Sequence, residues 1–582
     1  MRGEKVRTVS IGNQSFESVI TNDSFYVDKT GLIKEWWESL DVVTLITRPR
    51  RFGKTFNLDM LECFFSVKYK GRKDLFEKLS IWNDKKYHDI QGTYPVINMS
   101  FASVKGAEFK ELREGIVSAV SKAYEKHSYL KKSGVLNNDE IMAYDAFVRY
   151  INDISKDRNI PDQMLKDSIY RLSEYLTRYY GKKTIILLDE YDTPLQESYI
   201  NGFWEELVEF IRGLFNCTFK ENPYLERAIM TGITRVSKES IFSDLNNLTV
   251  VTSTSKKYAA YFGFTEQEVF AALDEAGLSE EKEEVKSWYD GFTFGTMQDI
   301  YNPWSITNFL DEREYKTYWA DTSSNAFVNC LIQTGSVDIK EKTEILLEGK
   351  CIETQIDEQI VFNQLDSDDD AVWSMLLASG YLKVQKKEFD KENGTYTYFL
   401  CLTNKEVMLM MRKLIRQWFG KYKSHYNGFT KALMQGNTDD MEYFMNEIAL
   451  NTFSMFDAGN KPSERTQPEK FYHGFVLGMM VDLREIYEIK SNHESGRGRY
   501  DIMMIPRKIN DKNTPPVIIE FKVFDAKKES NLTETAQRAL QQIEDMGYDA
   551  ELVSRGIEKE DIRHYGFAFK GKEVVIGAAL KV

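Results

Sequence analysis

Short runs of aliphatic and β-branched residues alternate with longer stretches of helical periodicity through the first part of the chain. Four runs stand out, at Val42–Thr47, Tyr94–Ser100, Thr184–Leu188 and Arg227–Thr231. Each run is continuously apolar rather than alternating, which is typical of strands buried on both faces of a parallel sheet. The pattern therefore predicts an α/β domain, over residues 1–255, whose parallel sheet is covered by helices.

The rest of the chain divides into three further parts. Residues 256–345 show helical periodicity with aromatic-rich connections, which indicates a helical lid domain. Residues 346–455 contain an acidic, turn-rich stretch and then apolar segments, which we interpret as a helix-rich connector. Residues 456–582 begin with a polar, Pro-bearing linker and continue as a compact α/β region. Its strands are predicted near Tyr500–Ile505, Val517–Val523 and Tyr565–Phe569.

Composition places the chain among globular proteins. It has 582 residues, of which 42% are hydrophobic and 29% charged. At ~150 residues per domain, this length corresponds to about four domains.

No apolar run approaches the roughly 18 residues that span a bilayer, so we expect no membrane segment. The five cysteines lie far apart and the N-terminus lacks a signal-peptide pattern, which predicts reduced thiols and a cytoplasmic protein.

The formal net charge is −14. An acidic balance of this kind does not attract a polyanion over long range, so any binding of nucleic acid must be local. Two stretches are locally basic, one around Arg48–Arg51 and the other over residues 412–423. The second stretch is also compatible with the solvated face of a helix.

A phosphate-binding loop is predicted where the first apolar run ends. The run leads into Arg48-Pro-Arg-Arg-Phe-Gly53-Lys54-Thr55, and an apolar helix follows. Gly53 would let backbone N–H groups approach phosphates, Lys54 would reach the β- and γ-phosphates, and the Thr55 hydroxyl would bind Mg²⁺. Arg48 stands where the general motif has its first glycine.

Two later apolar runs supply the partners that such a loop requires. Thr184–Leu188 ends in Asp189 and Glu190, as expected of a Walker B strand. Asp189 would hold Mg²⁺ through water and Glu190 would polarise the attacking water, although the same pair could simply end a buried strand. The run that ends at Thr231 is followed by Arg235, and related ATPases place a residue that senses the γ-phosphate in this region.

A carboxylate pair and a lysine mark the last part of the chain. Glu520 and Lys522 alternate with apolar residues in a predicted strand, so they share one face. A preceding strand that folds back would bring Asp501 beside Glu520. Two carboxylates suit Mg²⁺, and a nearby lysine can orient water in phosphodiester hydrolysis. The alternative is a charge pair that protects an edge strand.

These motifs resemble a large prokaryotic family with an AAA-ATPase-like domain. The resemblance is carried by TRPRRFGKTFNLDMLECFF, LLDEYDTPL, MTGITRVSKESIFSDLNNL, WYDGF and YNPWSI. An arginine-rich loop in place of the first glycine is usual in that family, so the departure at Arg48 agrees with it. With the residue pattern, the resemblance implies ATP and Mg²⁺ as cofactors and a nucleotide site of Arg51, Gly53, Lys54, Thr55, Asp189, Glu190, Thr231 and Arg235.

Members of this family typically carry a C-terminal PD-(D/E)XK nuclease domain. FYHGFVLG, ESGRGRYD, IIEFKV and ALQQIEDMGY resemble that domain in order and spacing. Carried over by position, Asp501, Glu520 and Lys522 form the catalytic core, with Glu469 and Gln542 in support. The resemblance implies an α/β chain in which a P-loop parallel-sheet ATPase domain, helical lid and connector precede a restriction-endonuclease-like domain over residues 456–582.

Two functions follow as hypotheses. The first is an ATP-hydrolysing protein coupled to a Mg²⁺-dependent nuclease domain that cleaves nucleic acid, with DNA as the expected substrate. The second is a nucleotide-switched regulatory or scaffold ATPase whose nuclease-like domain binds but does not cleave, which the acidic net charge favours. ATPases of this division often assemble with an arginine supplied in trans, for which Arg235 is a candidate. The sequence leaves a monomer and a homo-oligomer both open.

Overall fold

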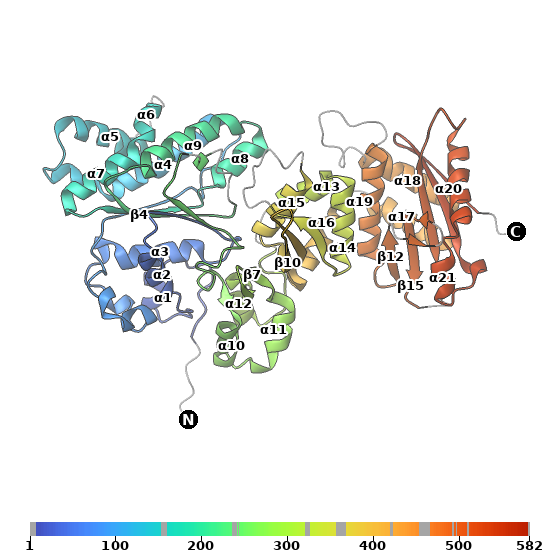
Figure 1. Cartoon of the computed structure of the whole chain (residues 1–582), viewed down its shortest axis with the longest axis horizontal. Helices are drawn as coiled ribbons and strands as arrows, with labels where there is room; N and C mark the ends of the chain where they lie inside the picture. The colour runs from blue at the N-terminus through green and yellow to red at the C-terminus, as the bar shows by residue number, and fades with distance from the viewer. Residues whose placement is uncertain are drawn as a thin grey trace. The chain divides into compact units, whose positions relative to one another are not determined.

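The structure is a computed structural model, and it describes residues 7–152, 160–234, 241–242, 244–320, 326–356, 368–418, 423–452, 466–491, 494–495, 498–508, 511 and 513–579. The chain forms two compact units (Figure 1). The first takes residues 1–323 and 353–406, and the second takes residues 324–352 and 407–582. Each unit is described by itself below. The finer division into four domains stays a prediction.

A five-stranded parallel sheet forms the centre of the first unit. Its strands are β1 (Val43–Thr47), β2 (Val96–Ser100), β3 (Thr184–Asp189), β4 (Leu225–Gly232) and β5 (Leu248–Val251), in the order β2-β3-β4-β1-β5. Neighbouring strands are parallel throughout. The predicted parallel sheet is thus confirmed. The edge strand β5 was not predicted from its sequence.

Helices cover both faces of this sheet, which explains why β1 and β3 are buried along their whole length. In Figure 1, α1, α2 and α3 lie on one side of the sheet and α4, α7 and α9 on the other. The helices are α1 (Phe16–Thr21), α2 (Gly31–Ser39), α3 (Lys54–Phe65), α4 (Phe109–Lys126), α5 (Asn138–Asn152), α6 (Asp162–Lys166), α7 (Ser168–Tyr180), α8 (Thr193–Asn201) and α9 (Trp204–Phe219). Short 3₁₀ turns are η1 (Val67–Tyr69), η2 (Lys73–Leu75), η3 (Ser80–Asn83), η4 (Lys85–Tyr87) and η5 (Ser128–Lys132).

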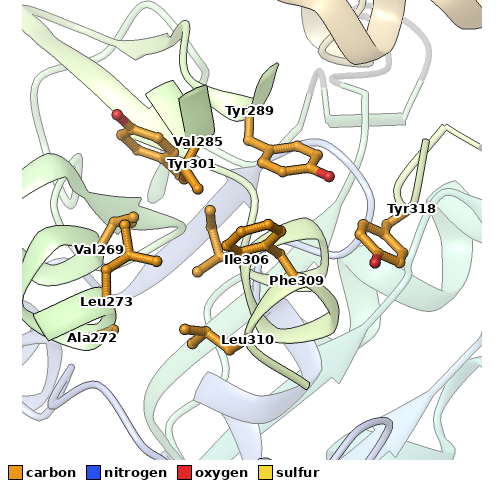
Figure 2. Packing of buried hydrophobic residues seen from close by; sticks show 10 residues of the cluster. All are labelled: Val269, Ala272, Leu273, Val285, Tyr289, Tyr301, Ile306, Phe309, Leu310 and Tyr318. Atoms are coloured by element: carbon orange, nitrogen blue, oxygen red, sulfur yellow. The ribbon is translucent and has the colours of Figure 1, made fainter. Parts of the chain in front are cut away.

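An aromatic core organises the region predicted as a lid. Its helices are α10 (Glu266–Glu275), α11 (Lys282–Tyr289) and α12 (Pro303–Glu312), with the 3₁₀ turn η7 (Ser279–Glu281). Side chains such as Tyr289, Tyr301 and Phe309 pack together in its interior (Figure 2). A small sheet was not expected there: β6 (Phe264–Thr265), β8 (Met297–Tyr301) and β7 (Phe292–Phe294) pair in that order.

A second small sheet follows in the region predicted as a helix-rich connector. It has the order β10-β11-β9, with strands β9 (Ile352–Gln355), β10 (Leu382–Asp390) and β11 (Thr395–Leu402), and α15 (Asp369–Ala378) precedes β10. Cys351 and Cys401 are disulfide-bonded, whereas Cys63 and Cys217 are free. The prediction of reduced thiols is therefore wrong for Cys351 and Cys401. Their separation in sequence gave no sign that β9 and β11 would be neighbours.

The second unit is built on a mixed five-stranded sheet. Its order is β12-β15-β16-β17-β18, and only β16 and β17 are parallel neighbours within it. The strands are β12 (Tyr487–Ser491), β15 (Ile502–Pro506), β16 (Val517–Val523), β17 (Arg563–Lys570) and β18 (Glu573–Ala578). A separate two-stranded pair joins β13 (Glu494–Ser495) to β14 (Gly498–Arg499). The three strands predicted in this region are β15, β16 and β17.

Several helices also belong to this part of the chain. They are α13 (Ala326–Thr334), α14 (Val337–Leu347), α16 (Lys405–Trp418), α17 (Lys423–Gln435), α18 (Thr438–Thr452), α19 (Thr466–Leu483), α20 (Leu532–Met546) and α21 (Ala550–Ser554), with the 3₁₀ turn η11 (Lys559–Asp561). Leu540 and Ile543 of α20 join the core beneath Met503 and Ile518. No helix in the described part of the chain is long and apolar enough to span a bilayer.

Two acidic side chains face each other at the small sheet of the first unit. Asp290 follows α11, and Asp299 lies in β8. Burial, and then the charge of Asp299, raise the pKa of Asp290 to about 7. The folded protein therefore holds this proton to a higher pH than the unfolded chain does, and stability falls as the pH rises toward 7.

We predict that Asp290→Asn raises the free energy of unfolding, relative to wild type, more at pH 8 than at pH 5. The substitution removes the charge that wild type must carry at the higher pH. After a discount for solvent screening, the expected gain is on the order of 2 kcal/mol. Thermal unfolding of variant and wild type at both pH values measures this difference. Asp311→Asn, an exposed position, serves as the control. If the free energy of unfolding differed between Asp290→Asn and wild type by the same amount at both pH values, the raised pKa of Asp290 would be contradicted.

Candidate functional site

The loop between β1 and α3 has the backbone geometry of an anion-binding turn. Gly53 has a φ of +79° and Arg51 a φ of +64°. A Cβ at Gly53 would meet no atom within 4 Å, so backbone conformation rather than space favours glycine there. Lys54 and Thr55 then open α3, whose first N–H groups point toward the end of the sheet.

Lys54 is held by the loop itself. Its Nζ donates to the carbonyl oxygens of Arg48 at 2.9 Å and Pro49 at 3.0 Å. The side chain is almost fully buried, and burial lowers its pKa. The ammonium group is therefore anchored on backbone atoms that an incoming anion can replace.

Thr55, Asp189 and Thr231 meet at the carboxyl ends of the central strands. The Thr55 hydroxyl donates to Asp189 Oδ2 at 2.6 Å, and the Thr231 hydroxyl donates to Asp189 Oδ1 at 2.5 Å. Parallel neighbours β3 and β4 bring the last two residues together, and α3 supplies the first. Burial raises the pKa of Asp189. The structure thus joins three residues that the sequence singled out separately.

Glu190 follows Asp189 in a left-handed conformation, with a φ of +53°. Its Oε2 accepts a hydrogen bond from the Thr193 hydroxyl at 3.2 Å, and it lines the same cavity as Lys54. Arg235, the remaining candidate near this site, lies outside the described residues.

Asp192 was not recognised from the sequence as part of this region. Its Oδ2 accepts from the backbone N–H groups of Ile233 at 2.9 Å and Thr234 at 3.0 Å, and from the Thr234 hydroxyl at 3.0 Å. The carboxylate thereby fixes the segment that follows β4. The sequence signal was faint, because two of the four groups that donate to this carboxylate are backbone N–H groups far along the chain.

Arg48 points away from the loop cavity. Its guanidinium donates to the carbonyl oxygens of Thr47 at 2.8 Å and Thr252 at 2.7 Å, and it lies 4.6 Å from the Phe294 ring centre. The side chain is fully buried, which lowers its pKa to about 9. The residue in place of the first glycine therefore ties the loop to the segment after β5.

A cavity of about 550 Å³ opens beside these residues. Loop residues Arg51 and Lys54 line it together with Phe25, Phe264 and Trp304. The Arg51 guanidinium lies 4.3 Å from the centre of the Trp304 ring. The volume is within the usual range for small-molecule sites, and charged and aromatic walls suit a ligand with phosphates and a flat ring.

A second cluster lies where β15 and β16 pair. Ile502 is opposite Ile519 in the antiparallel register, so Asp501 stands beside Glu520. Asp501 Oδ2 accepts a hydrogen bond from the Phe521 N–H at 2.6 Å. The pairing that the sequence predicted for these two strands is confirmed, although Asp501 immediately precedes β15 rather than lying within it.

Glu520 is the most constrained group in this cluster. It is only 3% exposed, and its Oε1 accepts from Gln542 Nε2 and lies 3.9 Å from Lys522 Nζ. Among the described residues, its Oε2 has no hydrogen-bond partner. Burial, and then the charge of Asp501, raise the pKa of Glu520 to about 8. A buried carboxylate oxygen without a partner is a position that suits a bound cation.

Gln542 links the lysine to the carboxylate. Lys522 Nζ donates to Gln542 Oε1 at 2.6 Å, and Gln542 Nε2 also donates to the Tyr548 hydroxyl at 3.1 Å. That hydroxyl in turn donates to the Arg499 carbonyl oxygen at 2.6 Å. Tyr548 was missed in the sequence, where only its position after Gln542 could have drawn attention to it.

Glu469 lies in the first turn of α19, and its side chain is outside the described part of the structure. Within the described residues, no three His, Cys, Asp or Glu side chains form a group that could hold a metal ion. Asp501 and Glu520 are therefore the acidic groups that the described structure brings to this cluster.

Comparison with known proteins agrees with both parts of the chain. A family model described as a predicted AAA-ATPase matches residues 10–242, and a model of the PD-(D/E)XK nuclease superfamily matches residues 467–579. The chain is also 22% identical over 564 residues to an uncharacterized protein in the vnfD 5′ region of Azotobacter chroococcum mcd 1, with 94% of each chain covered. The chain is therefore a protein with an N-terminal domain of the predicted AAA-ATPase family and a C-terminal domain of the PD-(D/E)XK nuclease superfamily.

Proposed function

We propose that this protein binds and hydrolyses ATP in the first unit, and that nucleotide state controls Mg²⁺-dependent cleavage of nucleic acid, with DNA as the expected substrate, in the second. The observation that carries the proposal is that Asp501, Glu520 and Lys522 lie in one cluster, in which Glu520 Oε2 has no hydrogen-bond partner among the described residues. A merely structural charge pair on a strand would have no need of the half-buried carboxylate of Asp501 beside it.

The nucleotide half of the proposal assigns roles to residues around the 550 Å³ cavity. Lys54 would exchange its carbonyl partners for the β- and γ-phosphates, with backbone N–H groups after Gly53 beside them. Thr55 and Asp189 are the groups that would hold Mg²⁺, which would neutralise charge on the phosphates. Glu190 would orient the attacking water. Arg51 would add positive charge from the cavity wall, and Thr231 would fix the Asp189 carboxylate.

The nuclease half assigns the cation to Asp501 and Glu520, with Glu469 as a supporting carboxylate. A bound Mg²⁺ would lower the pKa of water and stabilise charge on the phosphodiester. Lys522 would orient the attacking water and stabilise the developing charge, while Gln542 holds Lys522 and Glu520 in place. Because of these roles, substitutions at Lys522 and Glu520 test the nuclease assignment most directly.

A regulatory ATPase whose second unit binds nucleic acid without cleaving it is the second candidate. The net charge of −14 favours it, because an acidic protein binds nucleic acid weakly outside a local site. Binding without cleavage, with Mg²⁺ and Mn²⁺ both tested in the presence of ATP, would support this candidate over the first.

Lys54→Ala should weaken ATP binding about 10- to 100-fold, because it removes a charge-assisted contact to phosphate. Calorimetric titration with ATP and Mg²⁺ measures the change. Lys78→Ala, on the surface of the same unit, should bind as wild type does. Unchanged ATP affinity in Lys54→Ala would remove the loop from the nucleotide site.

Glu190→Gln should bind ATP normally and hydrolyse it at least ~100-fold more slowly, because the amide cannot accept a proton from water. Phosphate release under single-turnover conditions measures this step. Glu197→Gln changes another glutamate that lines the cavity, and it should keep most of the activity. Normal hydrolysis in Glu190→Gln would exclude the assigned role.

Lys522→Ala and Glu520→Gln should each reduce cleavage of nucleic acid at least ~100-fold while the ATPase rate stays unchanged. The assay follows labelled single- and double-stranded DNA and RNA with Mg²⁺ or Mn²⁺, with and without ATP. Lys527→Ala, an exposed lysine near β16, is the matched control. The nuclease assignment fails if wild type and Glu520→Gln leave the same products.

A further inference from the structure

The hairpin of β10 and β11 exposes two aromatic rings beside each other. Phe389 is 50% exposed and Tyr396 is 45% exposed. The two residues are opposite each other in the antiparallel register, and their ring centres are 4.8 Å apart. Single exposed apolar residues are ordinary on protein surfaces, but a contacting pair of exposed rings marks a place where another molecule can bind.

The register also shows what shares a face with these rings. Lys387 is opposite Tyr398, two positions from the Phe389–Tyr396 pair along each strand, so all four side chains project to one side. Lys387 Nζ lies 5.1 Å from the centre of the Tyr396 ring. Glu388 is opposite Thr397 and therefore projects to the other side. The aromatic face of the hairpin carries a cation and no carboxylate.

The charges of the hairpin add to this picture. Lys387 and Lys391 form no ion pair in the described structure, whereas Lys386 pairs with Glu388. The Asp390 carboxylate is occupied by the turn, where it accepts from the N–H groups of Glu392 at 2.8 Å and Asn393 at 3.2 Å. Lys387 lies beside the Tyr396 ring, and Lys391 is in the turn next to Glu392, in a chain whose net charge is −14. Cations near exposed rings suit an anionic, ring-bearing ligand.

Protection of an edge strand explains only part of the pattern. β10 is at the edge of its sheet, and lysines there discourage pairing with other chains. An exposed phenylalanine on that strand would instead favour association with other chains. The two rings stay exposed although Tyr398, Leu400 and Leu402 farther along β11 are buried.

We propose that the Phe389–Tyr396 face of this hairpin binds single-stranded nucleic acid, with bases stacked on the two rings and phosphates beside Lys387 and Lys391. Stacking on aromatic side chains next to basic residues is the usual way in which proteins bind single strands without reading sequence. The inference rests on the proposed function, in which nucleic acid is the substrate, and it names a place where the strand is held apart from the cleavage cluster.

Fluorescence anisotropy of the full-length protein with labelled dT₃₀, in EDTA to prevent cleavage, tests the proposal. An oligomer of the same length with abasic positions carries the same phosphates without bases. Wild type should bind dT₃₀ more tightly than the abasic oligomer. The double variant Phe389→Ala, Tyr396→Ala should bind dT₃₀ about 10- to 100-fold more weakly and lose this preference. Lys387→Ala should reduce the salt dependence by about 0.7 in the slope of log K against log salt.

Two further variants separate stacking from other effects. Phe389→Leu with Tyr396→Leu keeps an apolar surface without rings, so it should lose the preference for bases as the alanine variant does. Tyr443→Ala changes an exposed aromatic residue of α18, which is 58% exposed, and should bind as wild type does.

The proposal is overturned if the hairpin variants bind dT₃₀ as wild type does, or if wild type does not distinguish dT₃₀ from the abasic oligomer. The hairpin variants could also change the mass of the protein in light scattering without changing its binding of dT₃₀. The face would then be a contact between copies of the chain, and the proposal would be overturned. Wild-type binding to duplex DNA but not to dT₃₀ defeats this inference alone. Absence of binding to any nucleic acid defeats the proposed function itself.

Discussion

The antiparallel pairing of β15 with β16 is the constraint on which the nuclease-like cluster depends. With Ile502 opposite Ile519, Asp501 before β15 must stand beside Glu520, the fourth residue of β16. Both residues are acidic, and one of them is almost fully buried. A shift of the pairing by one position would turn Glu520 and Lys522 to the opposite face of the sheet. Hydrogen bonding between main chains thus determines where the two carboxyl groups meet.

That meeting is costly in the absence of a cation. Two carboxylates close together cannot both ionise easily, and burial, followed by the charge of Asp501, raises the pKa of Glu520. Gln542 and Lys522 relieve part of it through Oε1, while Oε2 stays without a partner among the described residues. A divalent cation would relieve the rest. This arrangement supports the proposed cation site.

The loop of the proposed nucleotide site is held in place in another way. Arg48 replaces the first glycine of the general motif, but its side chain is buried on backbone carbonyls and an aromatic ring, away from the cavity. The loop is consequently anchored at its start, and Arg51 and Gly53 both adopt left-handed conformations before α3, a conformation that glycine adopts easily. This explains how the loop keeps its geometry although the motif is incomplete.

Much of this architecture could be predicted from the sequence, because continuous apolar runs such as that of β3 have no other simple interpretation. The short strands β5 and β7 were missed, since four or three residues carry too little pattern. Asp192 and Tyr548 were missed because part of their partners are backbone groups distant in sequence, such as the Ile233 N–H and the Arg499 carbonyl oxygen, and residue types do not reveal such partners. The roles of Glu469 and Arg235 stay predictions, as does the division into four domains.

The most direct test of the central claim is anomalous diffraction from crystals of the protein soaked in Mn²⁺. The account predicts an anomalous peak bonded to both Asp501 and Glu520, on the side of Glu520 Oε2, which has no hydrogen-bond partner in the described part of the chain. Side chains that point apart, with no peak between them at saturating Mn²⁺, would contradict it.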